Sequence, residues 1–307
     1  MAIANTAIYG NHFDDDISGI FFDGYIEAEK EFSKIAKVAS APAGHHYTES
    51  ELSPLGELRD IDEGDAIQFD IPIEGHKKTI YYQKSGLGFQ ITKENVVDDL
   101  FGNFKQVPAK LGKSAAYKCE VEFFGLFNTA FVNTYHTAWD ALPICDAAHT
   151  TLKSLEAQPN EPAVAGALSE TTLQAAFEYY DTLVDEAGMP ISMNGPFKLV
   201  TSVDNRWITS QLMRNEFNLG SGNRDFLTTN PENNMIEPWV IHLTRHMVDS
   251  DRWFLIAADH DMRFWWKEEY GLESMDDFYT GNALFKTVGR FAPFVMDYHG
   301  IYGNPGA

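Results

Sequence analysis

An alternating run of apolar and polar residues between residues 67 and 73 constrains the fold of this chain more than any other feature. Its apolar members are Ile67, Phe69, Ile71 and Ile73. This period of two predicts a β-strand with one apolar face. We predict a reversal at Glu74-Gly75-His76-Lys77 and a returning strand over residues 79–91. A two-stranded ribbon is only marginally stable in water, because it has no second layer to cover its apolar side. We therefore expect its cover on another subunit.

The length and composition indicate a folded protein of about two compact units. A chain of 307 residues can bury a sizeable core and is long enough to divide once. A hydrophobic content of 44% and an aromatic content of 13% exclude general disorder. The two cysteines, Cys119 and Cys145, form no CxxC motif and no disulfide framework. Such usage is typical of a reducing compartment.

The charge and the apolar stretches exclude two classes of partner. The net charge is −22, from 45 acidic and 23 basic residues. Such a chain repels phosphates, so we expect neither tight nor sequence-specific binding of nucleic acid. The N-terminus, Met1-Ala-Ile-Ala-Asn-Thr-Ala7, has no basic start, and we do not expect it to be a signal peptide. No apolar stretch approaches the length needed to span a membrane, so we expect no membrane partner.

The first 130 residues predict an arm and two helices around the ribbon. Residues 1–23 are expected to form an extended arm, and residues 25–39 a short helix. After the ribbon, Thr92 is a suitable N-cap for a long helix, with a kink expected at Pro108 and Gly112. Apolar residues recur there at helical spacing. They are Val96, Val97, Leu100, Phe101, Phe104, Val107, Leu111, Ala115, Cys119, Phe123, Leu126 and Phe127.

The middle of the chain has an α/β pattern. Ser169 is the expected cap of a helix that ends at Gly188, and Ser202 is the expected cap of another. We predict strands over residues 197–200 and 253–258, and a surface loop over residues 220–234. The last strands, within residues 283–301, are expected to return to the first unit.

No group of residues forms a convincing catalytic or metal site. The best metal candidate is His242-Leu-Thr-Arg-His246, with Asp259 as a further ligand. A zinc protease needs a glutamate directly after the first histidine, and Leu243 stands there. The pair His45-His46 is a weaker candidate. Gly86-Leu-Gly88 lacks the third glycine of a dinucleotide fingerprint. We therefore assign no catalytic, cofactor-binding or metal-binding residues, and we expect the protein not to be an enzyme.

Several short motifs follow one another along the chain in a fixed order. They are Leu58-Arg-Asp-Ile-Asp-Glu63, Phe89-Gln-Ile-Thr-Lys-Glu-Asn-Val-Val-Asp-Asp99, Pro143-Ile-Cys-Asp-Ala-Ala-His149, Leu168-Ser-Glu-Thr-Thr-Leu173, Gly188-Met-Pro-Ile191, Lys286-Thr-Val-Gly-Arg-Phe291 and Asp297-Tyr-His-Gly-Ile-Tyr302. In this order they resemble the major capsid proteins of tailed bacteriophages, closest to the Mu-like major head subunit group. One departure from that group is the linker before His149, where a glycine and a Leu-Phe-Ser run are more usual.

The resemblance implies an α+β fold of the Hong Kong 97-like phage capsid type. Its expected parts are an N-terminal arm, an extended loop (a β-hairpin), a peripheral domain with a long spine helix, and an axial α/β domain. We place the arm at residues 1–43 and the extended loop at residues 44–92. The peripheral domain then covers residues 93–130 and 261–307, and the axial domain residues 131–260.

The resemblance also implies a function. Such subunits assemble as hexamers and pentamers into an icosahedral shell that encloses double-stranded DNA without sequence-specific binding. Portal, scaffolding and decoration proteins are possible partners, and the protein is expected in the virion after assembly in the host bacterial cytoplasm. Some relatives cross-link through a lysine and an asparagine, but no pair is assigned here. The alternatives are an encapsulin-like nanocompartment shell protein and a metallohydrolase that uses His242 and His246.

Overall fold

The structure is a computed structural model. The chain forms two compact units. Unit 1 comprises Met1–Tyr47, Ile80–Phe123 and Phe264–Pro293, and unit 2 comprises Thr48–Thr79, Phe124–Arg263 and Phe294–Ala307. The residues that the structure describes are 7–64, 66–67, 69–92, 106–133, 136–153, 155–193, 195–214, 217–219, 227–229, 240–277, 279–280 and 282–306.

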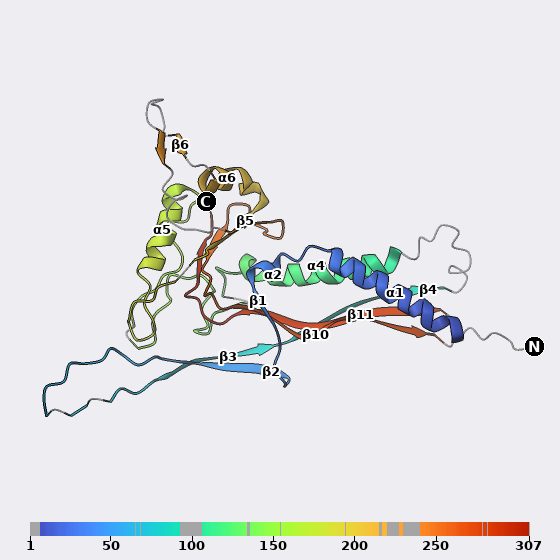
Figure 1. The fold of residues 1–307 in the computed structure, drawn as a ribbon, viewed down its shortest axis with the longest axis horizontal. Helices are drawn as coiled ribbons and strands as arrows, with labels where there is room; N and C mark the ends of the chain where they lie inside the picture. Colours follow the sequence, from blue (N-terminus) through green and yellow to red (C-terminus); the bar gives the residue numbers. More distant parts are fainter. Residues whose placement is uncertain are drawn as a thin grey trace, which may run out of the picture. The chain divides into compact units, whose positions relative to one another are not determined.

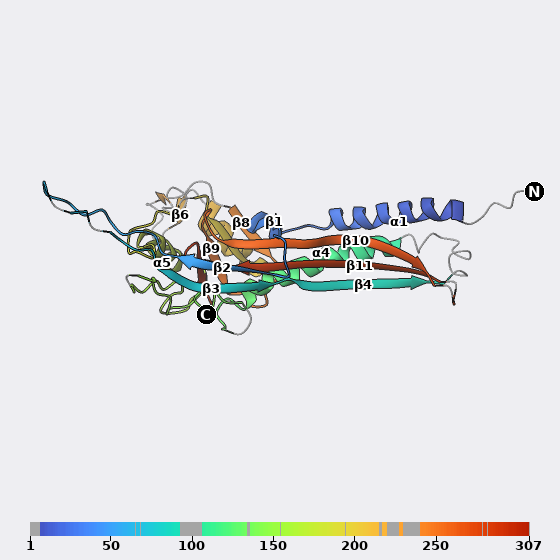
Figure 2. The same ribbon diagram turned by 90° about the horizontal axis from the view of Figure 1, so that it is seen from below.

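Unit 1 is built on a four-stranded sheet in the order β1-β10-β11-β4 (Figure 2). Strands β4 and β11 are antiparallel, in a register that runs from Gln83 opposite Phe291 to Ile91 opposite Ala283. Buried aromatic rings on β10 and β11 form part of its core, and Phe264 stacks on Phe291 with ring centroids 5.1 Å apart. The strands are β1 (Lys37–Ser40), β4 (Gln83–Ile91), β10 (Met262–Asp276) and β11 (Ala283–Val295).

The long helix α4 (Gln106–Asn128) buries the apolar face that its sequence predicts. The buried members are Leu111, Ala115, Ala116, Cys119, Phe123, Phe124, Leu126 and Phe127. The predicted beginning of this helix, with Phe101 and Phe104, lies outside the described residues. Pro108 lies close to the first described residue of α4, and the helix continues through Gly112.

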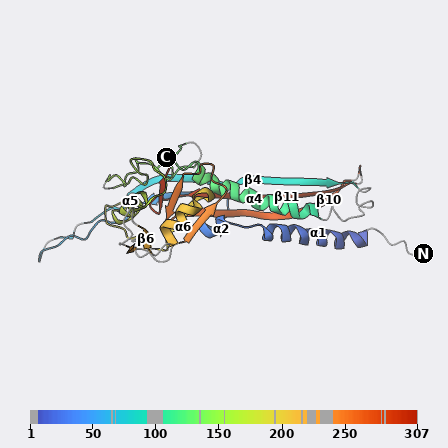
Figure 3. The ribbon, with the colours of Figure 1, turned by 90° about the horizontal axis from the view of Figure 1, so that it is seen from above.

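The expected extended arm is wrong over residues 7–23, because these residues belong to helix α1 (Ala7–Glu27). The helix is held by packing, since Phe21 is fully buried in unit 1. Two glycines allow α1 to approach α4 closely (Figure 3). A Cβ atom on Gly24 would lie 2.4 Å from the carbonyl oxygen of Ala109, and one on Gly112 would lie 2.3 Å from that of Phe21. The short helix α2 (Phe32–Ile35) follows.

Unit 2 contains a second four-stranded sheet, in the order β12-β9-β5-β8. Strands β5 and β8 are parallel, whereas β9 is antiparallel to both β5 and β12. Every residue of β9 is buried, as expected for the predicted strand over residues 253–258. The strands are β5 (Lys198–Ser202), β8 (Val240–Thr244), β9 (Trp253–Ile256) and β12 (Ile301–Asn304).

The last strands do not all return to unit 1. Strand β11 does, because it pairs with β4, but β12 pairs with β9. The side chains of β12 belong to the core of unit 2, where the Tyr302 ring lies 5.9 Å from the ring of Trp253. The expectation is therefore wrong for β12.

The helices of unit 2 begin where the sequence predicts. Ser169 caps α5 (Glu170–Asp181), and its hydroxyl forms a reciprocal capping box with Thr172. The helix ends at Asp181 rather than at Gly188, which instead adopts a φ of 88° in the turn that follows. The hydroxyl of Ser202 accepts the N–H of Asp204 ahead of α6 (Arg206–Arg214). Most of the predicted surface loop at 220–234 lies outside the described residues, which include the hairpin strands β6 (Phe217–Leu219) and β7 (Leu227–Thr229).

A two-stranded ribbon is present, but its pairing is not the predicted one. The expected returning strand over residues 79–91 is divided between β3 and β4, and β4 pairs with β11. Strand β2 (His46–Leu52) pairs with β3 (Glu74–Tyr81), and the chain reverses at Glu63-Gly64 (Figure 1). Gly64 has a φ of 97°, which glycine adopts without strain. The expected strand over residues 67–73 is wrong, because the described residues of this segment form no ladder. The expected reversal at 74–77 is wrong as well, since these residues begin β3.

Candidate functional site

The segment between β2 and β3, residues 53–73, is here named the β2–β3 loop, and it carries a row of uncovered apolar side chains. Phe69 is 92% exposed and Leu58 is 95% exposed. A globular subunit does not ordinarily leave so many large apolar side chains in water on one segment. The exposed members are Leu55, Leu58, Ile61, Ile67, Phe69, Ile71 and Ile73.

Hydrogen bonds give the β2–β3 loop a defined base, although its described residues form no strand. The N–H of Ser53 donates to the carbonyl of Ile73 (2.9 Å), and the N–H of Ile73 donates to the Ser53 hydroxyl (2.9 Å). Further out, Asp70 accepts the N–H of Gly56 at 2.8 Å and pairs with Lys153 at 2.5 Å. The hydrogen bond from Lys153 lowers the pKa of Asp70 to about 2. The two arms of the loop are thus tied to each other and to residue 153.

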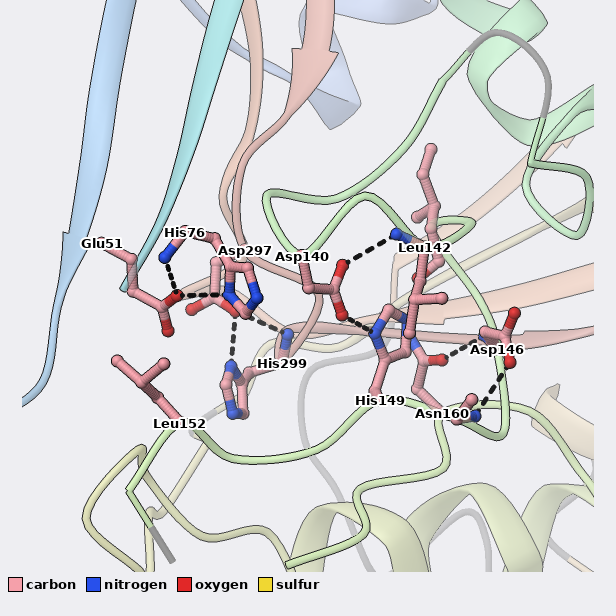
Figure 4. A network of polar contacts seen from close by, with 12 residues as sticks. Glu51, His76, Asp140, Leu142, Asp146, His149, Leu152, Asn160, Asp297 and His299 are labelled. Carbon is pink, nitrogen blue, oxygen red and sulfur yellow. Dashed lines mark hydrogen bonds and ion pairs between the residues drawn. The ribbon is translucent and has the colours of Figure 1, made fainter. Parts of the chain in front are cut away.

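A buried polar network begins directly beneath this base (Figure 4). Glu51 on β2 is only 3% exposed, and its carboxylate accepts both the backbone N–H (3.2 Å) and Nδ1 (3.1 Å) of His76 on β3. The carboxyl of Glu186, also buried, belongs to the same network and accepts the N–H of Leu152. Burial, with the charge of Glu51 as a further cause, raises the pKa of Glu186 to about 7.

The C-terminal segment supplies the basic partner of these acids. Nδ1 of buried His299 lies 2.5 Å from Asp297, and its Nε2 lies 3.8 Å from Glu186. Burial works to lower the pKa of His299, but the charges of Asp297 and Glu186 outweigh it and raise that pKa. Conversely, burial works to raise the pKa of Asp297, and His299 lowers it.

The linker that ends in His149 forms the other side of the network. Nδ1 of His149 lies 2.5 Å from Asp140, and its ring stacks on that of Tyr298 with centroids 3.9 Å apart. Asn160 fixes the linker, because its side chain accepts the N–H of Asp146 (2.8 Å) and donates to the carbonyl of Ile144 (2.8 Å). The linker motif is therefore held in place by polar contacts and aromatic stacking.

Lys78 on β3 adds a further anchor for the ribbon. Its ammonium group donates to the carbonyl oxygens of Thr137 and of Val295, the latter at 2.6 Å. Burial lowers the pKa of Lys78 to about 8, although Asp140 and Asp261 oppose the shift. This lysine thus ties β3 to two other segments of unit 2, and the bonds between Glu51 and His76 tie β2 to β3.

The sequence-derived metal candidates do not converge. His242 lies on β8, whereas His246 lies beyond the strand, where its ring stacks on Phe124 with centroids 5.3 Å apart. Nδ1 of His260 accepts the N–H of Met262, and Asp259 is exposed. His45 is exposed. Among the residues that the structure describes, no three His, Cys, Asp or Glu side chains are grouped so that they could hold a metal ion.

Sequence reasoning did not single out Glu51 or Glu186 in this network. His149, Asp297 and His299 stood inside motifs that carried the resemblance, but without a chemical role. The signal that could have identified the acids is weak, because Glu51 is one of several acids in an alternating strand.

In the described part of the chain, no helix is both long and apolar enough to cross a membrane.

Comparison with known proteins identifies the family. A sequence model of the phage capsid protein family matches residues 77–304, about three quarters of the chain. The chain belongs to the phage capsid protein family. No curated protein sequence matches it. Function as a phage capsid protein, predicted from the motifs, is confirmed by this family assignment.

Solved capsid structures share the fold. The capsid of a native GTA particle is 11% identical with a TM-score of 0.60, and the match covers 91% of this chain and 90% of that one. The structure of Gordonia phage Cozz is 16% identical with a TM-score of 0.54, over 91% of this chain and 87% of that one. A virus-like particle from Pyrococcus furiosus is 9% identical with a TM-score of 0.55, over 95% of this chain and 99% of that one. The predicted α+β fold of the Hong Kong 97-like type is confirmed.

Proposed function

We propose that this capsid protein is the main shell subunit of a tailed bacteriophage and assembles as hexamers and pentamers into an icosahedral head around double-stranded DNA. The observation that carries the proposal is the uncovered apolar row of the β2–β3 loop. A second copy of the chain would supply the cover, because every subunit of a lattice both donates such a loop and receives one. The row would then be buried at each contact.

The free energy expected from burying the apolar row suits a lattice of weakly associating subunits. Full burial of a large apolar side chain contributes about 1.5–3 kcal/mol. Scaled by their present exposure, Ile67, Phe69, Ile71 and Ile73 would contribute roughly 4–8 kcal/mol gross per loop. Ordering of the loop and loss of subunit freedom offset part of this. A single contact is therefore weak, whereas many repeated contacts hold a shell.

The parts of the subunit receive roles under this proposal. Residues 1–43 act as the arm, residues 44–92 as the extended loop, and residues 93–130 and 261–293 as the peripheral domain. Residues 131–260 form the axial domain together with residues 294–307, because β12 pairs with β9. The buried network would set the direction in which the extended loop leaves the axial domain. Portal, scaffolding and decoration proteins are the other proposed partners, and assembly takes place in the host bacterial cytoplasm.

The charge of the subunit suits a container for DNA. A net charge of −22 with no basic tail lets packaged DNA slide along the wall, because each cationic contact would strengthen phosphate binding steeply. We propose no catalytic, cofactor-binding or metal-binding residue. The metallohydrolase alternative finds no converging ligand set among the described residues.

The experiment removes the β2–β3 loop and keeps its base. Residues 54–72 are replaced by a short Gly/Ser turn, so that the bonds between Ser53 and Ile73 can still form. We expect a folded subunit that yields monomers or isolated capsomers, while the natural chain yields closed shells in negative-stain microscopy. A variant in which the loop keeps its length and serine replaces only the exposed acids Asp60, Asp62 and Glu63 serves as the control, because it leaves the apolar row intact. Closed shells from the loop-deleted variant would contradict the proposal.

A compartment that encloses a protein rather than DNA is the second candidate, since the virus-like particle from Pyrococcus furiosus has the same fold. The content of particles purified from the natural source distinguishes the two. Nuclease-protected DNA supports a phage head, and a stoichiometric enclosed protein supports the compartment.

A further inference from the structure

We propose that unit 1 contains a binding pocket for a small, uncharged aromatic molecule with one hydroxyl group, that is, a phenol-type ligand. The pocket is lined by helix α4 and by strands β4, β10 and β11, where α4 lies over the sheet (Figure 1). Its volume of about 300 Å³ is at the lower end of the range for ligand pockets, so it suits a small ligand. The inference goes beyond shell formation, which requires no such ligand.

The walls of the pocket are largely apolar. Leu111 and Ala115 on α4 are buried, whereas Leu87 on β4 and Tyr117 and Val121 on α4 are exposed to solvent. A cavity that is rimmed by exposed large apolar side chains favours an apolar occupant. An aromatic ring can also pack against the ring of Tyr117. The body of the ligand is therefore apolar and flat.

Thr287 on β11 places a hydroxyl group in the wall of this apolar pocket. The residue is only 2% exposed, and its Oγ1 has no hydrogen-bond partner among the residues that the structure describes. Burial of a hydroxyl without a partner is costly, and native proteins satisfy nearly all such groups. A ligand with a polar atom at this point would supply the missing hydrogen bond.

A second polar feature of the wall lies beside Thr287. The hydroxyl of Ser85 on β4 lies 2.5 Å from the phenolic oxygen of Tyr270 on β10. Ser85 is opposite Gly289, two residues along β11 from Thr287 and therefore on the same face of the sheet. Gly289 leaves room for the Tyr270 ring, because a Cβ atom there would lie 2.8 Å from it. Since only one of the two hydroxyls donates to the other, the pair keeps an O–H for a further acceptor.

These groups favour a neutral hydroxyl over a charged end. The Thr287 hydroxyl can donate and accept, and a ligand hydroxyl can do the same, so it can bond to Thr287 and to the Ser85–Tyr270 pair. A carboxylate would be buried there without a free cation, which is costly. Lys118 lines the pocket, but it already forms a salt bridge with Glu122.

The apolar row of the β2–β3 loop does not match this pocket. Its exposed side chains are leucine, isoleucine and phenylalanine, which carry no polar atom. Insertion of such a side chain would leave the Thr287 hydroxyl unpaired. The occupant is therefore a small molecule rather than the loop of a second copy.

The experiment measures the binding of phenol and of toluene to the full-length unassembled subunit by ligand-detected NMR. The two probes have nearly the same shape and differ in the hydroxyl group. We expect phenol to bind about tenfold more tightly, because toluene leaves the buried hydroxyl of Thr287 unpaired. Thr287→Val keeps the shape of the side chain without its hydroxyl, so it should reduce the preference to about twofold or less.

Two further variants keep the test decisive. Thr280→Val changes an exposed threonine that does not line the pocket, and it should leave the preference for phenol unchanged. Ala115→Leu puts a larger side chain into the cavity and should weaken the binding of both probes at least about tenfold. It takes the place of Thr287→Val if that variant fails to fold.

Several results would overturn the proposal. They are equal binding of phenol and toluene, no binding of phenol, a preference that survives Thr287→Val, and binding that Ala115→Leu leaves unchanged. Phenol should also bind to closed shells of the natural chain. Binding that is present in the unassembled subunit and lost in the shells would show that a second copy of the chain fills the pocket, and it would overturn the proposal as well.

Discussion

Replacing Phe69 with serine should weaken assembly without weakening the subunit. The Phe69 ring is 92% exposed, so it contributes little to the free energy of unfolding of the single chain. Substitutions at such positions usually change that energy by less than about 0.5 kcal/mol. If a neighbouring subunit covers the ring, the loss at each contact is about 1.5–3 kcal/mol.

This loss of contact free energy predicts a higher subunit concentration for assembly. Because about 1.4 kcal/mol corresponds to a factor of ten, the subunit concentration at which shells first form should rise roughly 10- to 150-fold for Phe69→Ser. Light scattering against concentration measures that threshold, and thermal unfolding of the unassembled subunit measures the stability. Phe69→Leu is the matched control, since leucine keeps most of the apolar surface and should raise the threshold far less.

Two results would refute the reasoning. If Phe69→Ser forms shells at the same concentration as the natural chain, the ring is not at a subunit contact. If the variant subunit instead melts at a much lower temperature, the ring stabilises the subunit itself, and its exposure in the isolated chain is misleading.

Two further predictions concern the core of unit 1. Gly112→Ala should destabilise the subunit by about 1–3 kcal/mol, because the added carbon would lie 2.3 Å from the carbonyl oxygen of Phe21 on α1. The control is Gly19→Ala, where an added Cβ would have nothing within 4 Å, and it should instead stabilise α1 by about 0.5–1 kcal/mol. Denaturant titration measures the free energy of unfolding of both variants. Equal changes in that free energy would exclude the close crossing of α1 and α4. Phe123→Ala should cost about 3–5 kcal/mol, because that side chain is fully buried, and it should give insoluble or unfolded subunits. A soluble Phe123→Ala subunit with a normal melting temperature would contradict this assignment of the buried face.

Local signals predicted some elements well. The cap at Ser169 and the buried face of α4 were confirmed, because capping bonds and the apolar spacing of a helix depend on residues within a few positions of one another. Strand β9 was predicted for a similar reason, since a short apolar run that is wholly buried is typical of a central strand.

Other elements depend on contacts that the sequence does not display. The alternation from Ile67 to Ile73 predicts a strand, but a strand needs a pairing partner, and these residues have none in the described part of the chain. Helix α1 was missed because three consecutive aspartates, Asp14 to Asp16, interrupt its apolar pattern, whereas the burial of Phe21 and the glycine contacts with α4 hold it. The pairing of β12 with β9 could not be predicted, because nothing local distinguishes it from a return to the first sheet.

The buried network was the least predictable part of the subunit. Glu51, Glu186 and His299 come from three distant parts of the chain, and each alone has the appearance of an ordinary surface residue. Only their convergence beneath the β2–β3 loop makes them buried partners. Spacing rules act within one element, so they cannot detect a cluster of this kind.

The central claim is that the apolar row of the β2–β3 loop is a contact between subunits. A cryo-electron microscopy map of the assembled particle, at a resolution that shows side chains, tests it most directly. The account predicts that Ile67, Phe69 and Ile71 lie against the surface of a neighbouring subunit and are buried there. A closed shell in which these three side chains remain in solvent, or fold back onto their own subunit, would contradict it.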